Sequence, residues 1–123
     1  MSRARFALVY LSSKAEALRP FVEDDAEALL ATLTFGTTSP PPGTPEQVSA
    51  RLTANRRSLS ALVRSFCEVE RIPFLDATPA LEELARNGEN GYLVADTHWN
   101  PAGQEALLGV LVPFLREKGL LGD

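Results

Sequence analysis

Residues 5–11 read Arg-Phe-Ala-Leu-Val-Tyr-Leu, a short apolar run with β-branched and aromatic members. Such a run is typical of a strand that is buried on both faces of a parallel sheet. Ser13 follows the run and is itself followed by Glu16, a spacing that predicts a capping box at the start of a helix. Beyond Pro20, apolar residues at helical spacing predict a second helical piece to about Leu33.

The middle of the chain predicts a loop, a long helix and a further strand. Residues 35–44 hold two Gly, three consecutive Pro and four Ser or Thr, which indicates an internal loop. Thr44-Pro45-Glu46-Gln47 is a second capping-box pattern, and one long helix is expected from Pro45 to about Glu70. Residues 72–75 then predict a short buried strand.

The last third of the chain predicts two more helices. Thr78-Pro79 begins one that continues to Arg86, and Asn100-Pro101 begins another that continues to Gly119. Residues 91–95 predict a brief third strand between them. Strands that alternate with helices favour parallel strands joined by right-handed crossovers. The expected fold is therefore α/β, a single domain over residues 1–123 with a short parallel sheet of two to three strands and about four helices.

Composition narrows the class of protein. The chain has 123 residues, of which 45% are hydrophobic and 23% charged, as in one ordinary globular domain. The formal net charge is -4 and the arginines are scattered, so no nucleic-acid partner is expected. Cys67 is the single cysteine, which excludes an internal disulfide. Together with the single histidine, His98, it also excludes a zinc site built mainly from Cys and His.

We find no targeting signal in the sequence that indicates a cellular compartment. Its apolar runs are shorter than the roughly 20 residues of a membrane helix. Residues 1–10 lack the apolar core and cleavage site of a signal peptide. Neither a transmembrane segment nor a signal peptide is therefore expected in this chain, and its localisation stays open.

The segment with the clearest chemistry runs from Asp96 to Gly103 and reads Asp-Thr-His-Trp-Asn-Pro-Ala-Gly. It lies in a loop between a predicted strand and a helix, where α/β proteins keep their reactive groups. An Asp that accepts a hydrogen bond from one ring nitrogen of His98 fixes its tautomer and leaves the other nitrogen free to take a proton. Asp96 and His98 thus form a candidate acid–base dyad. The alternative is an ordinary histidine beside an aspartate, because Asp-x-His is a frequent tripeptide.

Three segments resemble the SGNH (GDSL-like) hydrolases. Asp96 to Gly103 looks like the family's last conserved block in its Asp-x-His-Trp-Asn-x-x-Gly form. Residues 72–81 are similar to the strand and turn that precede that block. Residues 6–14 resemble an upstream strand that ends in Pro-Ser-Lys, with Ser12 in place of the Pro. The resemblance spans almost the whole chain, with residues 35–44 its least informative part.

This resemblance implies part of a three-layer α/β/α, flavodoxin-like domain that acts as an esterase, lipase or carbohydrate O-acyltransferase. His98 would be the general base and Asp96 its orienting partner, on an acylated small molecule or carbohydrate, with no cofactor. The family's Gly-Asp-Ser nucleophile block and Gly-x-Asn block do not occur here. The chain therefore resembles the carboxyl-terminal part of such an enzyme, inactive or weakly active alone. Full-length relatives with this motif are often extracytoplasmic.

Several alternatives remain open beside the dyad. Ser12 and Ser13 follow the first predicted strand and are candidate nucleophiles, although Ser13 is first of all a helix cap. Trp99 and Asn100 are candidate substrate-pocket residues, with packing and helix capping as their simpler roles. Without its nucleophile the chain could instead be a non-catalytic α/β remnant that binds or oligomerises. An exposed sheet edge would then recruit a second copy or a partner chain.

Two further sites rank below the dyad. Cys67 could form a nucleophile pair with His98, but on the apolar face of a helix a cysteine is usually a small buried hydrophobe. A metal could be held by Asp76, Asp96 and His98, but only one of these is an imidazole. No metal is therefore expected.

Overall fold

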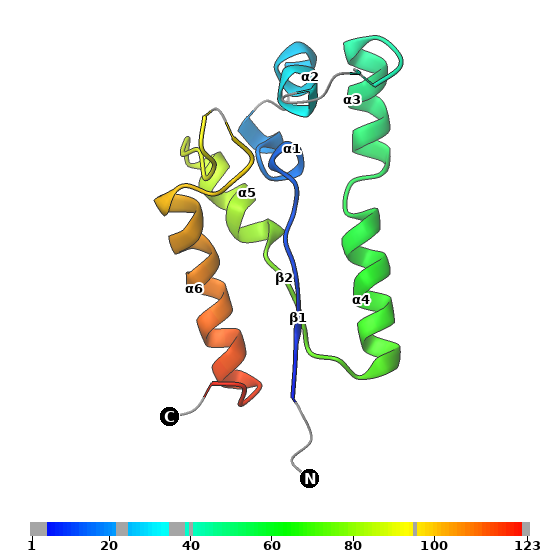
Figure 1. Ribbon diagram of the computed structural model, residues 1–123. Helices are drawn as coiled ribbons and strands as arrows, with labels where there is room; N and C mark the ends of the chain where they lie inside the picture. The colour runs from blue at the N-terminus through cyan, green and yellow to red at the C-terminus, as the bar shows by residue number, and fades with distance from the viewer. Residues whose placement is uncertain (1–4, 22–24, 35–38, 40, 95, 122–123) are drawn as a thin grey trace.

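The computed structural model describes residues 5–21, 25–34, 39, 41–94 and 96–121 (Figure 1). Along the chain these residues form β1 (Leu8–Tyr10), α1 (Lys14–Ala17), the 3-10 turn η1 (Arg19–Phe21), α2 (Ala26–Thr34), α3 (Pro45–Ala54), α4 (Ser58–Glu70), β2 (Phe74–Asp76), α5 (Thr78–Arg86) and α6 (Pro101–Glu117). Within the described residues, no helix is both long enough and apolar enough to cross a membrane.

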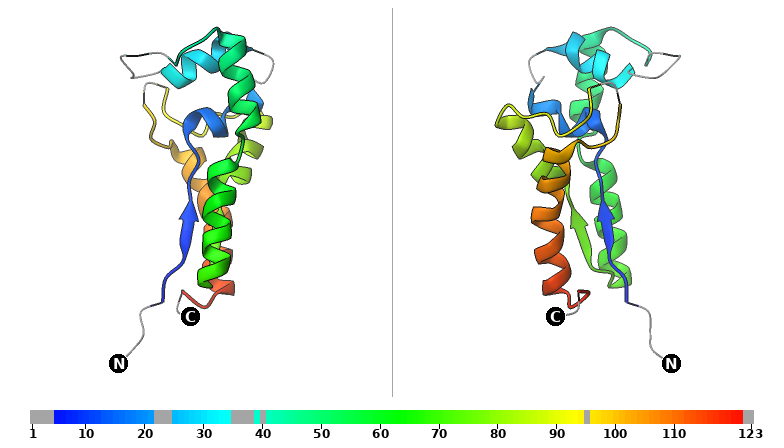
Figure 2. Two further views of the ribbon diagram at one scale, coloured as in Figure 1. Left: turned by 90° about the vertical axis from the view of Figure 1, so that its right-hand side faces the viewer. Right: turned by 60° about the vertical axis from the view of Figure 1, so that its left-hand side comes forward.

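The two strands confirm the predicted α/β class. β1 and β2 pair in parallel, with Leu8 opposite Phe74 and Tyr10 opposite Asp76. The chain between them passes through α4, which runs along one side of the strand pair, while α6 lies on the other side (Figures 1 and 2). The carboxyl ends of both strands lead into helices, β1 into α1 and β2 into α5.

The expected third strand is wrong for the described part of residues 91–95. Tyr92 forms only an isolated antiparallel bridge with Trp99, and the chain folds back on itself instead of joining the sheet. The amide of Leu93 donates to the carbonyl of His98 at 2.9 Å, and that of Asn100 donates to the carbonyl of Gly91 at 3.0 Å. These local bonds pair residues 91–93 with residues 98–100 instead of with β1 or β2.

The expected single helix from Pro45 to Glu70 is also wrong, because the structure breaks it at residues 55–57. Arg57 has a left-handed backbone, with φ at 61°, and ends the run between α3 and α4. The break lets two successive side chains reach one acceptor: Arg56 and Arg57 donate to the carboxylate of Glu82 at 2.8 and 2.7 Å. In a continuous helix, successive side chains point about 100° apart, which directs Arg56 and Arg57 away from a shared acceptor. This ion cluster therefore favours a break in the helix.

The helix caps follow the sequence in part. At α3 the capping box is complete, since the amides of Thr44 and Gln47 each donate to the other residue's side chain. At α1 the Ser13 hydroxyl accepts from the amide of Glu16 at 3.2 Å. The carboxylate of Glu16, however, accepts from the hydroxyl of Tyr10 at 3.2 Å. Only the serine half of the predicted box at α1 is therefore observed.

The core lies at the carboxyl end of the strands, between α1, α5 and the start of α6. Its buried members are Ala17, Leu18, Leu81, Ala85 and Tyr92, with Trp99 and Ala106 packed against them. This cluster anchors both ends of the loop that joins α5 to α6. The loop containing Asp96 and His98 is thus attached to this buried cluster.

Candidate active site

The loop before α6 is attached to α1 by a lysine. The Nζ of Lys14 donates to the backbone carbonyls of Leu93 at 2.8 Å, Asp96 at 3.1 Å and Val94 at 3.4 Å. Because α1 begins where β1 ends, these bonds hold the loop at the carboxyl end of the strands. This is the edge at which open α/β sheets place their ligands.

Asp96 and His98 are in direct contact, as predicted. Nδ1 of His98 lies 2.6 Å from Oδ1 of Asp96, and the same oxygen accepts the backbone N–H of His98 at 3.1 Å. One carboxylate oxygen thus fixes both the ring and the main chain of the histidine. With Nδ1 as the donor to Asp96, the lone pair of the neutral imidazole is on Nε2. The His98 side chain is 80% exposed, so Nε2 is accessible to a reactant.

The charge of Asp96 is stabilised by the same contact. The hydrogen bond from the His98 side chain, followed by that from its backbone N–H, lowers the pKa of the Asp96 carboxyl below its usual value. A depressed pKa keeps the carboxylate ionised and able to stabilise an imidazolium beside it. The pair has the geometry of the orienting acid and the base of a catalytic triad.

A hollow of about 340 Å³ lies beside the histidine. Its lining comes from the segment after β1, from α1 and from the loop before α6. The lining residues are Ser12, Ser13, Lys14, Tyr92, Thr97, His98 and Trp99. The structure therefore brings the two serine candidates and His98 to one hollow. Its volume falls in the range of small-ligand pockets.

The two serines differ in their bonding. The Ser13 hydroxyl is used as the cap of α1. Ser12 is 6% exposed, and its Oγ is buried with no hydrogen-bond partner among the described residues. Its carbonyl accepts the hydroxyl of Tyr92 at 3.3 Å. A buried hydroxyl without a partner is uncommon in proteins, so the Ser12 hydroxyl, which has none among the described residues, differs from the Ser13 hydroxyl that caps α1.

Trp99 and Asn100 have structural roles first. The Asn100 carbonyl oxygen accepts the amide of Gly103 at 3.0 Å, which caps α6. Its Nδ2 donates to the carbonyls of Asn90 and Tyr92, so the side chain also closes the loop. Trp99 packs against the core and lines the hollow as well. Asn100 is not among the residues that line the hollow.

The lower-ranked sites are not assembled in the described residues. The Asp76 carboxylate accepts the amide of Thr78 at 3.0 Å and lies 3.7 Å from Arg57, away from the hollow. Within the described residues, no group of three or more His, Cys, Asp and Glu is placed to hold a metal ion. Cys67 is buried in α4, as expected of a small hydrophobe, and is not among the residues that line the hollow.

Sequence reasoning missed Lys14 and Tyr92 at this site. Lys14 precedes the carbonyls that it binds by about 80 positions, and no local pattern indicates so distant a contact. Tyr92 lies in a segment whose sequence predicts a strand, and that pattern indicates no partner for its hydroxyl. The signal available for Lys14 was its place directly after a strand and a capping serine.

The chain matches no family model, no curated protein and no solved structure. The interpretation of the site therefore rests on the residues and contacts given above.

Proposed function

We propose that this chain supplies the acid–base pair of an SGNH-type ester hydrolase or O-acyltransferase, for a serine nucleophile that is not in the chain. One observation carries the proposal: Nδ1 of His98 lies 2.6 Å from Oδ1 of Asp96, and the ring is exposed beside a hollow. The substrate class is an acylated small molecule or carbohydrate. No cofactor is required for this chemistry.

The reaction proceeds in two steps. Nε2 of His98 takes the hydroxyl proton as the serine oxygen attacks the acyl carbon, and Asp96 stabilises the imidazolium that forms. The imidazolium then gives the proton to the departing alkoxide as the bond between it and the acyl carbon breaks. The acyl group, now on serine, passes to water in a hydrolase or to an alcohol in a transferase, with His98 again the base.

We further propose that β1 and β2 belong to a larger three-layer α/β/α, flavodoxin-like sheet. Support comes from the parallel pair with α4 and α6 on opposite sides (Figures 1 and 2). A second support is an apolar stripe on α4, formed by Leu59, Leu62, Phe66 and Val69, each more than half exposed. A partner chain or a second copy of this chain would cover the stripe and an open strand edge.

Two other functions have a specific observation behind them. The Ser12 hydroxyl has no partner in the part of the chain that the structure describes, which favours a rearranged hydrolase in which Ser12 is the nucleophile. Ser12 is nearly buried, however, so its attack requires the hollow to open. The exposed stripe on α4 favours a non-catalytic binding or oligomerisation module, in which the dyad plays no part.

Hydrolysis of p-nitrophenyl acetate separates these functions. Wild type, His98→Gln and Asp96→Asn are compared with Glu105→Gln, a control on the exposed surface of α6. Without its serine, the dyad activates water as the nucleophile, which predicts slow release of p-nitrophenol. This rate should fall to the buffer rate in His98→Gln, be lowered in Asp96→Asn and be unchanged in Glu105→Gln. Equal rates in wild type and His98→Gln would overturn the proposal and favour the non-catalytic module.

A fluorophosphonate probe then locates the nucleophile. The proposal predicts a folded chain that stays unmodified by intact mass. An adduct on Ser12 that disappears in both Ser12→Ala and His98→Gln would overturn this proposal and favour the rearranged hydrolase.

A further inference from the structure

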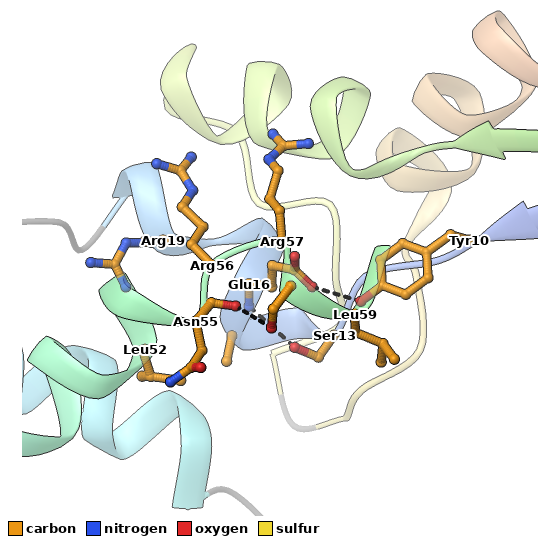
Figure 3. Close-up of a pocket in the computed structure, with 11 residues that line it drawn as sticks. Tyr10, Ser13, Glu16, Arg19, Leu52, Asn55, Arg56, Arg57 and Leu59 are labelled. Carbon is orange, nitrogen blue, oxygen red and sulfur yellow. Dashed lines mark hydrogen bonds between the residues drawn. The ribbon is translucent and has the colours of Figure 1, made fainter. Parts of the chain in front are cut away.

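A second hollow, of about 160 Å³, lies where α1 meets the junction of α3 and α4 (Figure 3). Its apolar surface comes from Ala15, Leu52, Leu59 and the ring of Tyr10. Ser13 borders both hollows, but His98, Trp99 and Tyr92 border only the first. A cavity of about 150 Å³ accommodates benzene, so this hollow has room for a ligand of that size.

A buried cation lines this hollow. Arg19 is 7% exposed, and its guanidinium donates to the Thr53 hydroxyl, its one hydrogen bond to the described residues. Its Nε is buried with no partner there, and no described carboxylate pairs with it. A guanidinium removed from water without a carboxylate is unfavourable, because a single neutral hydroxyl replaces little of its hydration. A bound anion would supply the missing partner.

The other charged groups at the hollow are already paired. Arg56 and Arg57 donate to Glu82, and Figure 3 shows both side chains extending away from Glu16. Glu16 accepts the Tyr10 hydroxyl, and burial raises the pKa of its carboxyl. Among the described residues, Arg19 is thus the cation at this hollow with which no carboxylate pairs, and Glu16 is the group that opposes an incoming negative charge.

We propose that this hollow binds a small organic carboxylate, with its carboxylate on Arg19 and its apolar body against Leu52 and Leu59. The combination of a largely apolar wall and one buried guanidinium fits such a ligand. An inorganic anion would leave the apolar wall unused. The inference does not depend on the function of Asp96 and His98.

Benzoate is the probe, and benzamide is its neutral counterpart. Binding is followed by amide chemical shifts, which locate it, and by calorimetry. We expect benzoate to shift amides of residues 13–19 and 52–59, with benzamide binding at least about tenfold more weakly. Equal binding of the two compounds would overturn the role of charge. Tighter binding of inorganic phosphate than of benzoate would overturn the assignment of the ligand as an organic carboxylate.

Three variants test the contacts against one control. Arg19→Gln should weaken benzoate binding at least about tenfold, and Glu16→Gln should strengthen it because a repelling charge is removed. Arg116→Gln, on the surface of α6, should leave binding unchanged. If Arg19→Gln does not fold, Leu52→Trp decides, since it fills the hollow and keeps the charge. Unchanged benzoate binding in folded Arg19→Gln or in Leu52→Trp would overturn the site.

Discussion

The ammonium of Lys14 donates to the backbone carbonyl of Asp96 at 3.1 Å, across 82 positions of sequence. The same Nζ binds Leu93 and Val94, so one side chain at the end of β1 holds the loop in which His98 and Asp96 meet. The dyad is a local contact between residues two apart. Its position over the strands is set by this distant lysine.

Replacing Lys14 should therefore loosen the loop. Lys14→Met removes three donated bonds, and we expect the free energy of unfolding to fall by about 1–2 kcal/mol. Hydrogen exchange at the amide of His98, which donates to Asp96, should become faster. Denaturant unfolding and exchange by NMR check both effects. Lys118→Met is the control, because Lys118 donates through its side chain to the adjacent Glu117; equal losses in the two variants would contradict the role of Lys14.

The Asp96 carboxyl should titrate below its usual range, as followed by carboxyl carbon chemical shifts. In His98→Ala its pKa should rise toward the ordinary value, because the bond that lowers it most is removed. Because the pKa of Asp96 is lower in the folded chain than in the unfolded chain, the ionised carboxylate stabilises the fold at pH values above the unfolded-state pKa. This stabilisation is lost as the pH falls through the folded-state pKa. In His98→Ala the free energy of unfolding should therefore depend less on pH in this acidic range. An unchanged Asp96 titration would show that the contact does not persist in solution.

Gly103 of α6 should not tolerate a side chain. A Cβ there would lie 2.1 Å from the carbonyl oxygen of Gly91, a backbone atom that cannot move aside alone. Gly103→Ala should therefore destabilise the fold by about 2–3 kcal/mol, measured by urea unfolding. Gly109→Ala is the control in the same helix, where a Cβ meets nothing within 4 Å. It should stabilise by about 0.5–1 kcal/mol, and similar effects of the two variants would be inconsistent with the close approach of Gly91 and Gly103.

Glu82 should contribute more to stability than its neighbour Glu83. The Glu82 side chain is 1% exposed and binds Arg56, Arg57 and Arg86, while Glu83 is 64% exposed and binds Arg86 alone. Glu82→Ala should cost about 3 kcal/mol, the lower end for a broken buried pair, because the arginines regain water. Glu83→Ala should cost less than about 0.5 kcal/mol. Equal losses would mean that the ion cluster does not hold α5 to the α3–α4 junction.

The apolar stripe on α4 should mediate self-association. We expect sedimentation velocity to detect species larger than the 13.3 kDa monomer, and Leu62→Glu with Phe66→Glu to shift the chain toward monomer. The two residues are 68% and 55% exposed, so the change should leave the circular dichroism spectrum intact. A monodisperse wild-type monomer would contradict self-association.

Local patterns anticipated the elements that depend on neighbours in sequence. The strand at residues 8–10, the caps at Ser13, Thr44 and Asn100 and the helix after Asn100 follow from short-range spacing. The contact between Asp96 and His98 is equally local, and it was predicted. The long helix was wrong because a distant residue overrode a correct local period: Glu82 binds Arg56 and Arg57 at the break. The third strand was wrong because residues 91–93 pair with residues 98–100 and not with the sheet.

The sequence by itself determined the α/β class, the order of the main elements and the one histidine paired with an aspartate, because apolar period, helix caps and a two-residue spacing are properties of adjacent residues. Only the tertiary structure decided that Lys14 holds the dyad loop and that, among the described residues, the buried Ser12 hydroxyl has no partner and Arg19, beside a hollow, has no carboxylate. These features arise between residues far apart in the chain. Burial sets their energies, since the cost of an unpaired polar group depends on what surrounds it and not on its neighbours in sequence.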